Sequence, residues 1–266
     1  MLLRDRNAVI YGAGGAVGGA VAPAFAREGA RVFLAGRTIA RLDAVAKEIT
    51  AEADSAQVDA RDQRAVEEHA AAVAEQAGSI DVSFNAIGID HVQAIPLLEL
   101  SPEDFALPIA TYPRTQFVTS TAAARHMTGK RTGVILTLST TASRVPGAMI
   151  GGFGAACTAV EAFSRQLAAE LGPYGIRVVC LRPDAMPETA RLGSHTREVW
   201  GHYADRMGMT LGSSISPRAL RCDAPDARRG GERRGVHGLG PGRRHDGDRR
   251  QHQLRRGHRL AHECRT

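Results

Sequence analysis

Short apolar runs alternate along the first 190 residues with longer segments whose apolar positions recur about every 3.6 residues. Short apolar runs are typical of buried strands and the longer period is typical of helices. The predicted strands are residues 7–11, 31–36, 55–60, 80–86, 133–139 and 176–183. The predicted helices include residues 20–29, 40–53 and 65–78. This alternation predicts an α/β fold, a doubly wound parallel sheet that helices cover on both faces.

The composition divides the chain at about residue 216. A chain of 266 residues with 43% hydrophobic residues can form one large domain, which we assign to residues 1–216. Residues 1–216 hold 20 Lys and Arg against 22 Asp and Glu, whereas residues 217–266 hold 14 Arg against 6 Asp and Glu. The net charge of +6 therefore comes from the tail. The tail contains no Ile, Phe, Tyr, Trp, Met or Lys, so we expect it to be disordered.

Nothing in the sequence indicates a membrane or secreted protein. The N-terminal residues lead directly into an apolar strand without the apolar region and cleavage site of a signal peptide, and no segment reaches about 18 uninterrupted apolar residues. The four cysteines are too few and too far apart for a disulfide framework or a zinc site. They are Cys157, Cys180, Cys222 and Cys264. We expect a cytoplasmic protein with no membrane partner and no metal.

Glycines fill the predicted turn between the first strand and the first helix, in YGAGGAVGGAVAPAF. Backbone N–H groups at a helix N-terminus bind phosphate oxygens where no Cβ stands in the way. The turn therefore predicts a phosphate site, with a tight turn packed beneath a helix as the alternative interpretation.

The second predicted strand ends at Gly36 and is followed by Arg37. A dinucleotide-binding fold that selects NAD places an acidic side chain here against the ribose hydroxyls, whereas a guanidinium can bind a 2′-phosphate. Arg37 therefore favours NADP(H) over NAD(H). The alternative is a solvated surface arginine.

The order and spacing of several motifs resemble the short-chain dehydrogenase/reductase family over about residues 5–190. The motifs contain Gly12, Ala16, Gly18, Arg37, Asp59 in QVDARD, Asn85 in FNAIG and the segment EAFSRQLAAELGPYGIRVVCLRP. The resemblance implies that Gly12 and Gly18 bind the diphosphate of the cofactor and that Val17 lies near its nicotinamide half. It also implies that Asp59 meets the adenine and that Asn85 lines the cofactor cleft. Ala16 and Tyr11 stand where the family usually has Gly and Thr.

The same resemblance places four unusual residues at the catalytic positions. The family acts through Asn, Ser, Tyr and a Lys four residues after the Tyr, and the tyrosine exchanges the proton while hydride moves. Here Tyr112, Thr140, Phe153 and Cys157 occupy those positions. We expect Thr140 to polarise the substrate oxygen and Tyr112, or water, to handle the proton. The alternatives are a packing tyrosine where Pro113 disturbs the start of a helix and, for Cys157, a small buried hydrophobe.

The resemblance implies an NADP(H)-dependent oxidoreductase that moves hydride to or from a small carbonyl or alcohol substrate, and a homo-oligomer. The alternative is an NADP-binding sensor or scaffold without turnover. In the family the loop after the sixth strand, about residues 184–216 here, closes on the substrate. Met186, Trp200 and Met207 in this loop favour an apolar ligand, although the same residues could pack a lid.

The tail has two interpretations. An arginine-rich arm could bind nucleic acid, in which case binding would weaken steeply with salt. We favour a frameshift near residues 218–222, because GC-rich codons for this stretch, read one base later, can encode segments that resemble the C-terminal helix, Ala-Ser-Asp turn and final strand of the family. On this hypothesis nucleic acid is not a partner. The sheet then lacks its last strand and exposes an edge, so that stability and assembly both suffer.

Overall fold

The computed structural model describes residues 1–49, 51–145, 147–184, 186, 188, 189, 192, 201, 202 and 204–206. Residues 217–266 and most of the predicted substrate loop, including Trp200 and Met207, lie outside the described residues. The predicted disorder of the tail therefore stays a prediction. No described helix combines the length and the hydropathy needed to cross a membrane.

The described core is a six-stranded sheet in the order β3-β2-β1-β4-β5-β6, and every neighbouring pair is parallel. The prediction of a doubly wound parallel sheet is confirmed. The chain moves outward from β1 to β3 and then returns to place β4 on the other side of β1. A crevice forms at such a reversal, at the carboxyl ends of the strands. The strands are β1 Arg6–Tyr11, β2 Ala30–Gly36, β3 Ala53–Gln57, β4 Val82–Asn85, β5 Gly133–Leu138 and β6 Ile176–Leu181.

The helices alternate with the strands as the sequence pattern predicts, with two differences at their ends. The helices are α1 Ala16–Arg27, α2 Ile39–Lys47, α3 Gln63–Ala77, α4 Pro102–Met127 and α5 Phe153–Leu171, with short 3₁₀ turns η1 Thr141–Ser143 and η2 Gly172–Tyr174. The predicted helix 40–53 is too long, because α2 ends at Lys47 and Ala53 already pairs with Val32 of β2. Pro113 does not mark a helix start, because α4 begins eleven positions earlier, where the hydroxyl of Ser101 accepts from the Asp104 N–H at 3.0 Å.

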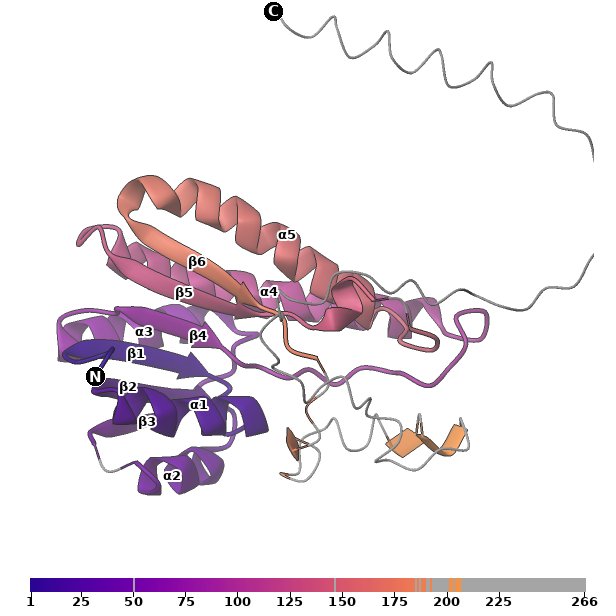
Figure 1. Cartoon of the computed structure of the whole chain (residues 1–266), viewed down its shortest axis with the longest axis horizontal. Helices are drawn as coiled ribbons and strands as arrows, with labels where there is room; N and C mark the ends of the chain where they lie inside the picture. The colour runs from indigo at the N-terminus through magenta and orange to yellow at the C-terminus, as the bar shows by residue number, and fades with distance from the viewer. Residues whose placement is uncertain are drawn as a thin grey trace, which may run out of the picture. The chain divides into compact units, whose positions relative to one another are not determined.

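Side chains of β1 alternate between two cores. Val9 and Tyr11 pack in the core formed with α3, α4 and α5, whereas Ala8 and Ile10 pack in the core formed with α1 and α2. Figure 1 shows α4 and α5 on one side of the sheet and α1 and α2 on the other. All four side chains are almost completely buried. The sheet is thus an apolar layer with period-two alternation, as expected for a strand covered on both faces.

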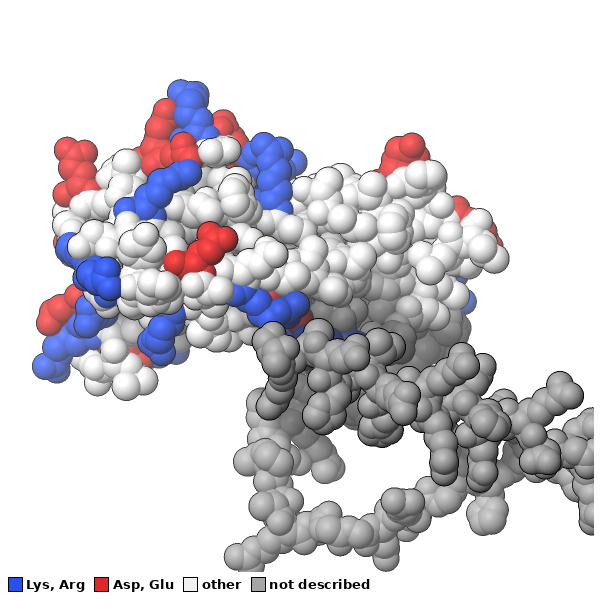
Figure 2. Space-filling view, turned by 90° about the horizontal axis from the view of Figure 1, so that it is seen from above, with Lys and Arg blue, Asp and Glu red and all other residues white. Residues whose placement is uncertain are grey.

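The covering of the sheet is uneven. On β6 the side chains that face away from α5 remain exposed, with 39% exposure at Val179 and 38% at Leu181. Three apolar side chains within α4 are also exposed, those of Phe105, Leu107 and Phe117. In Figure 2 charged side chains gather toward the left end of the described part and leave much of the remaining face without charge. These surfaces are the ones where further protein could pack.

Candidate active site

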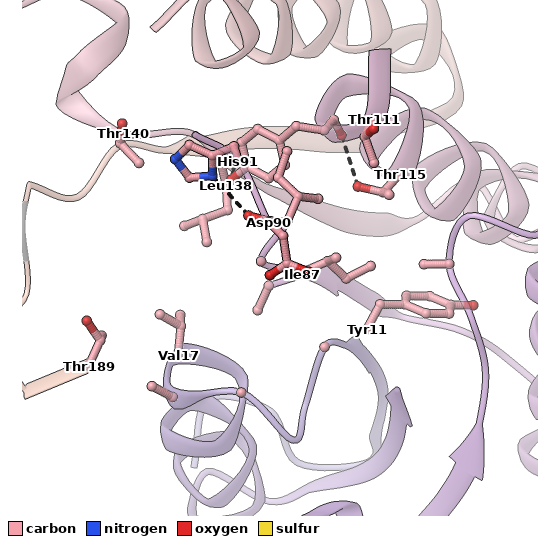
Figure 3. Close-up of a pocket in the computed structure, with 18 of the residues that line it drawn as sticks. Tyr11, Val17, Ile87, Asp90, His91, Thr111, Thr115, Leu138, Thr140 and Thr189 are labelled. Carbon is pink, nitrogen blue, oxygen red and sulfur yellow. Dashed lines mark hydrogen bonds between the residues drawn. The ribbon is translucent and has the colours of Figure 1, made fainter. Parts of the chain in front are cut away.

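A cavity of about 890 Å³ runs along the carboxyl ends of the strands. It reaches from the ends of β2 and β3, past the crevice between β1 and β4, to the end of β5 and the start of α5. Figure 3 shows Thr140, His91 and Leu138 on one wall and Val17 and Thr189 across from them. Its volume lies in the range of small-molecule and cofactor sites.

The glycine turn forms the floor of this cavity through two close backbone approaches. Gly12 has φ +81°, and a Cβ there would lie 2.8 Å from the Ala86 backbone. A Cβ at Gly18 would lie only 2.4 Å from the Gly12 carbonyl oxygen, so no larger residue fits without movement of α1. Gly18 itself is buried and does not line the cavity. Its place supports a packing role for Gly18 rather than the direct diphosphate contact that the resemblance implies.

The wall that a diphosphate would meet is made by the residues where α1 begins. They are Gly14, Gly15, Ala16 and Val17. Gly15 is the N-cap and the first turn of α1 contains no acidic residue. The first N–H groups of a helix have no intrahelical partner and favour anions. Ala16 lines the cavity as well, so its methyl group narrows this approach as the sequence indicates.

Arginines gather at the end of the cavity beyond β2. Arg37, Arg41 and Arg61 all line it. The carboxylate of Asp59 lies among them and accepts two bonds from Arg61, at 3.0 Å from Nε and 2.6 Å from Nη2. The hydrogen bonds from Arg61 hold the pKa of Asp59 below its usual value, and the nearby charge of Arg37 adds to this. Sequence reasoning identified Arg37 and Asp59 here but missed the other two arginines.

Asn85 is the last residue of β4 and points away from the cavity. The side chain is 1% exposed and donates to the Thr115 carbonyl at 3.0 Å and the Thr119 hydroxyl at 2.9 Å. Its Oδ1 accepts from the Ile87 N–H at 3.0 Å. Asn85 is thus not among the residues that line the cavity, and its place in the cofactor cleft stays a prediction. Asn85 instead fixes the loop after β4, and the residues after it line the cavity.

Thr140 and Cys157 are neighbours, as their predicted positions require. Thr140 lines the cavity, and its hydroxyl lies 3.4 Å from the Cys157 sulfur and accepts from the Ala142 N–H at 3.2 Å. Cys157 is completely buried among apolar residues, and burial raises the pKa of its thiol. This environment matches the interpretation of Cys157 as a small buried hydrophobe.

Tyr112 lines the cavity with its ring, but its hydroxyl is already bonded. Tyr112 is 3% exposed, and its hydroxyl donates to the Leu138 carbonyl at 2.7 Å. Burial raises the pKa of this phenol above its usual value. A proton donor needs the opposite, because its pKa must approach the working pH. These contacts favour the packing alternative, and a proton-transfer role for Tyr112 stays a prediction.

His91 is the residue that sequence reasoning missed. It lies in the loop after β4 and lines the cavity, and its ring stacks on Phe153 with 4.3 Å between ring centres and 12° between planes. Nδ1 lies 2.9 Å from the Ile89 carbonyl oxygen and Nε2 lies 2.8 Å from Nε2 of Gln93. The available signal was a histidine five positions after the end of a predicted cleft strand, in NAIGIDH.

Glu161 of α5 ties the loop after β5 to the helix. Glu161 is 5% exposed. Its carboxylate forms ion pairs with Arg144 Nη2 at 3.0 Å and Arg182 Nε at 2.8 Å, and it accepts a hydrogen bond from the Ser143 hydroxyl. Burial alone would raise the pKa of its carboxyl, but the bonds from Ser143 and Arg144 and the charge of Arg182 lower it overall. The carboxylate is thus paired, as a buried charge must be. It fixes the segment that carries Thr140.

The short chain dehydrogenase family model matches residues 6–199, which is most of the described chain. The chain belongs to the short-chain dehydrogenase family. The gluconate 5-dehydrogenase of Gluconobacter oxydans is 31% identical over 184 residues, which cover 68% of this chain and 71% of the relative. The L-rhamnose 1-dehydrogenase (NAD(P)(+)) of Azotobacter vinelandii is 33% identical over 191 residues, which cover 69% of this chain and 74% of the relative.

Solved structures of short-chain oxidoreductases and dehydrogenases have a similar fold. A metagenomic short-chain oxidoreductase in complex with NADP has a TM-score of 0.64 and 28% identity, and the match covers 70% of this chain and 85% of that one. An NAD⁺-bound xylitol dehydrogenase has a TM-score of 0.67 and 25% identity, with 75% and 78% covered. The short-chain dehydrogenase fold binds a nicotinamide cofactor, and members of the family act on small alcohols and carbonyl compounds.

The residues of this short-chain dehydrogenase fit such a cofactor at its phosphate end. Gly12 leaves the turn without a side chain, and a side chain there would collide with the backbone after β4. The first turn of α1 and the arginines beyond β2 supply donors for phosphate groups along the same cavity. Neither lysine of the chain lines the cavity, and Lys130 donates to the Gly78 carbonyl at 2.6 Å.

Proposed function

We propose that this short-chain dehydrogenase is an NADP(H)-dependent oxidoreductase that acts on a small alcohol or carbonyl compound. The observation that supports NADP(H) most directly is the charge at the end of the cavity beyond β2. Three guanidinium groups line it, and the carboxylate of Asp59 is engaged by Arg61. A 2′-phosphate gains charge-assisted hydrogen bonds in such a setting, whereas a ribose diol gains little from it.

The cofactor supplies hydride chemistry, and the residues of the chain bind and orient. The first turn of α1 would hold the diphosphate, and Arg37 with Arg41 would hold the 2′-phosphate. Thr140 lines the other end of the cavity, and its hydroxyl oxygen accepts a hydrogen bond from the Ala142 N–H. Its proton is in position to donate to a substrate oxygen and so stabilise charge on it during hydride transfer.

The substrate end of the cavity is mixed in character. Phe153, Ile150, Val145 and Met186 line it together with Thr140 and Gln93. The apolar part agrees with the expectation from Met186, whereas the three relatives described above are named for a sugar acid, a sugar and a polyol. A test of turnover therefore needs both classes, polyols with aldonic acids and apolar secondary alcohols.

Cofactor selectivity provides the first test. Titration of the full-length protein with NADPH and NADH, followed by nicotinamide fluorescence, should show tighter binding of NADPH. Replacement of Arg37 by Ala should weaken NADPH binding by about 10- to 100-fold, as expected for the loss of a charge-assisted contact of roughly 1.5–3 kcal/mol. NADH binding should change little.

Arg165→Ala is the matched control, because Arg165 is an exposed residue of α5 that does not line the cavity. Equal affinity for the two cofactors, or equal losses for both in Arg37→Ala, would refute the NADP(H) assignment. Binding of NADPH without turnover on either substrate class would instead support an NADP-binding sensor or scaffold, an alternative that the Phe153 and Cys157 positions suggest.

We also propose that the protein forms homo-oligomers through the side formed by α4 and α5. Phe117 of α4 is 49% exposed and makes an edge contact with Phe163 of α5, with 5.9 Å between ring centres. Exposed aromatic pairs between helices are common in protein interfaces. Light scattering of the purified protein measures the oligomeric state.

A further inference from the structure

Oxidation of an alcohol releases a proton with the hydride, and the cavity must accept it. The Tyr112 phenol is bonded to the Leu138 carbonyl, and the thiol of Cys157 is buried outside the cavity. Thr140 can donate a hydrogen bond but does not ionise near neutral pH. Among the described residues that line the cavity, His91 is the only imidazole, the side chain that ordinarily titrates in this range.

The contacts of His91 suit a proton acceptor. The Ile89 carbonyl can only accept a hydrogen bond, so its contact at 2.9 Å places the ring proton on Nδ1. Nε2 then carries the lone pair and accepts from the amide of Gln93, which also lines the cavity, at 2.8 Å. The hydroxyl of an alcohol must replace this amide before Nε2 can take its proton. A base whose other nitrogen is held by an oxygen acceptor has a fixed tautomer and orientation, which is the arrangement of histidine bases in hydrolytic enzymes.

The position of His91 relative to Phe153 adds a second, independent observation. Phe153 is the first residue of α5 and occupies the position at which motif spacing places the proton-exchanging tyrosine. The His91 ring is stacked on the Phe153 ring with 4.3 Å between ring centres, and Figure 3 shows His91 on the same side of the cavity as Thr140. The imidazole is thus stacked on the ring that occupies the position of the family's tyrosine.

The segment that carries His91 is held rigidly. Ala94 and Met149 both have left-handed backbone conformations, with φ of +66° and +58°, and the Ala94 N–H donates to the Met149 carbonyl at 2.8 Å. Arg206 Nη1 donates to the Ala94 carbonyl at 2.8 Å. Such conformations are unfavourable for residues with a Cβ and persist where surrounding contacts enforce them. They are typical of positions that orient reacting groups.

We propose that His91 is the acid–base residue of this enzyme and works in place of the tyrosine that the chain lacks at position 153. In oxidation the carbinol C–H bond breaks and its electron pair leaves as hydride to the oxidised nicotinamide. The O–H bond breaks, the proton moves to Nε2 of His91, and the carbonyl forms. In reduction Nε2 returns the proton. This inference rests on the proposed oxidoreductase function.

The test compares wild type with His91→Gln, which keeps a hydrogen-bonding side chain but cannot exchange a proton. With NADP⁺ and the panel of polyols and apolar secondary alcohols, kcat should fall by about 10²- to 10⁴-fold, the usual contribution of a general base. NADPH affinity should stay unchanged. His126→Gln is the matched control, because His126 lies near the C-terminal end of α4 and outside the cavity.

A pH profile separates a proton-transfer role from a packing role. Wild type should lose activity on the acidic side of an inflection, and His91→Gln should lack that inflection. The other titratable or charged groups that line the cavity are Asp90 in the same loop, Asp184 after β6, Asp59 after β3, Tyr11 of β1, Tyr112 of α4 and the arginines Arg37, Arg41 and Arg61. Cys157 of α5 lies outside the cavity, and Arg206 contacts the same segment as His91. They are present in both proteins, so they cannot produce the difference.

A restoring double substitution gives a second criterion. Phe153→Tyr with Cys157→Lys supplies the pair that the family uses, and in this background His91→Gln should no longer reduce turnover. NMR of the His91 ring, assigned by its loss in His91→Gln, adds a readout apart from activity. Its nitrogen shifts should show a proton on Nδ1 and should change when NADP⁺ and an alcohol are added.

The outcomes are distinct. Wild-type turnover that His91→Gln retains, a pH profile shared by both proteins, or ring signals with the proton on Nε2 would overturn the role of His91 and leave the oxidoreductase function intact. Tight NADPH binding with no wild-type turnover on the panel would overturn the proposed function, and the His91 inference with it. If His91→Gln does not fold, His91→Asn takes its place in the kinetic comparison and in the assignment of the ring signals, with the same expected and contradicting outcomes.

Discussion

At the scale of the residue, the size of Gly18 decides where α1 can lie. A Cβ at this position would approach the Gly12 carbonyl oxygen to 2.4 Å and the Ala13 Cα to 2.8 Å, both backbone atoms that a side-chain rotation cannot move. Gly18→Ala should therefore lower the free energy of unfolding by about 1–3 kcal/mol, as overpacking does. It should also weaken NADPH binding, because the first turn of α1 must shift.

Denaturant unfolding and fluorescence titration measure both effects. Gly129→Ala is the control, since nothing lies within 4 Å of a Cβ there, and it should change stability by less than about 0.5 kcal/mol. Equal stability of Gly18→Ala and wild type would show that α1 tolerates the displacement.

Single residues also mark the limit of what the sequence could predict about the site. The spacing of the motifs assigned Thr140 and Cys157 to two catalytic positions, and in the structure the Thr140 hydroxyl lies 3.4 Å from the Cys157 sulfur. The bond from Tyr112 to Leu138 joins positions on α4 and β5. The stack of His91 on Phe153 depends on the path of a loop. Neither is encoded in local periodicity, so neither was predicted.

At the scale of the element, the predicted strands that became β1, β2 and β4 agree closely with the observed ones, because a strand buried on both faces is a continuous apolar run. The strand predicted at residues 55–60 is instead β3 Ala53–Gln57, whose sequence ADSAQ is not an apolar run. The α2 boundary was missed for the opposite reason. Residues 48–53 continue an apolar period that suits a helix, but pairing of Ala53 with Val32 draws this part of the chain into the sheet. Tertiary pairing overrides local propensity at such a boundary.

The contact of α3 with β1 predicts a pH dependence of stability. His69 packs edge-on against Tyr11 with 5.6 Å between ring centres, and burial lowers the pKa of His69 from 6.5 to about 4. Between these values the unfolded chain binds a proton that the native chain does not. The free energy of unfolding should therefore fall by about 2 kcal/mol as the pH drops from 6.5 to 4, with no contribution from His69 above this window.

Urea unfolding at several pH values measures this slope. His69→Gln should flatten it, whereas His126→Gln on α4 should retain the slope of wild type. An unchanged slope in His69→Gln would mean that other groups produce the acid sensitivity.

At the scale of the whole molecule, the described part leaves one half of a sheet face open. Val179 and Leu181 point away from α5, and they are 39% and 38% exposed. β6 is the last strand of the described sheet and pairs only with β5 within it. On the side of α1 and α2, described helices pack on β1, β2 and β3. An open apolar face beside an open edge is a position for self-association.

The frameshift hypothesis accounts for this open face and predicts how to close it. The segment read one base later would supply an apolar helix for the face and a strand for the edge of β6. A chain that carries this segment in place of residues 217–266 should gain on the order of 2 kcal/mol from covering Val179 and Leu181 alone. Its melting temperature should rise by about 4–8 °C. Calorimetry measures the rise, and light scattering should show one defined oligomer.

Val179→Lys in the same extended chain is the control, because a charge under the new helix should cancel most of the gain. The hypothesis has its own direct test in the DNA of this region. An uninterrupted frame that encodes the printed tail, together with the corresponding protein mass, would refute a frameshift. If the extended chain had the same melting temperature as the original chain, the shifted segment would not pack on β5 and β6. Only a higher melting temperature that Val179→Lys abolishes places the new helix on that face, because the lysine would have to be buried without a partner.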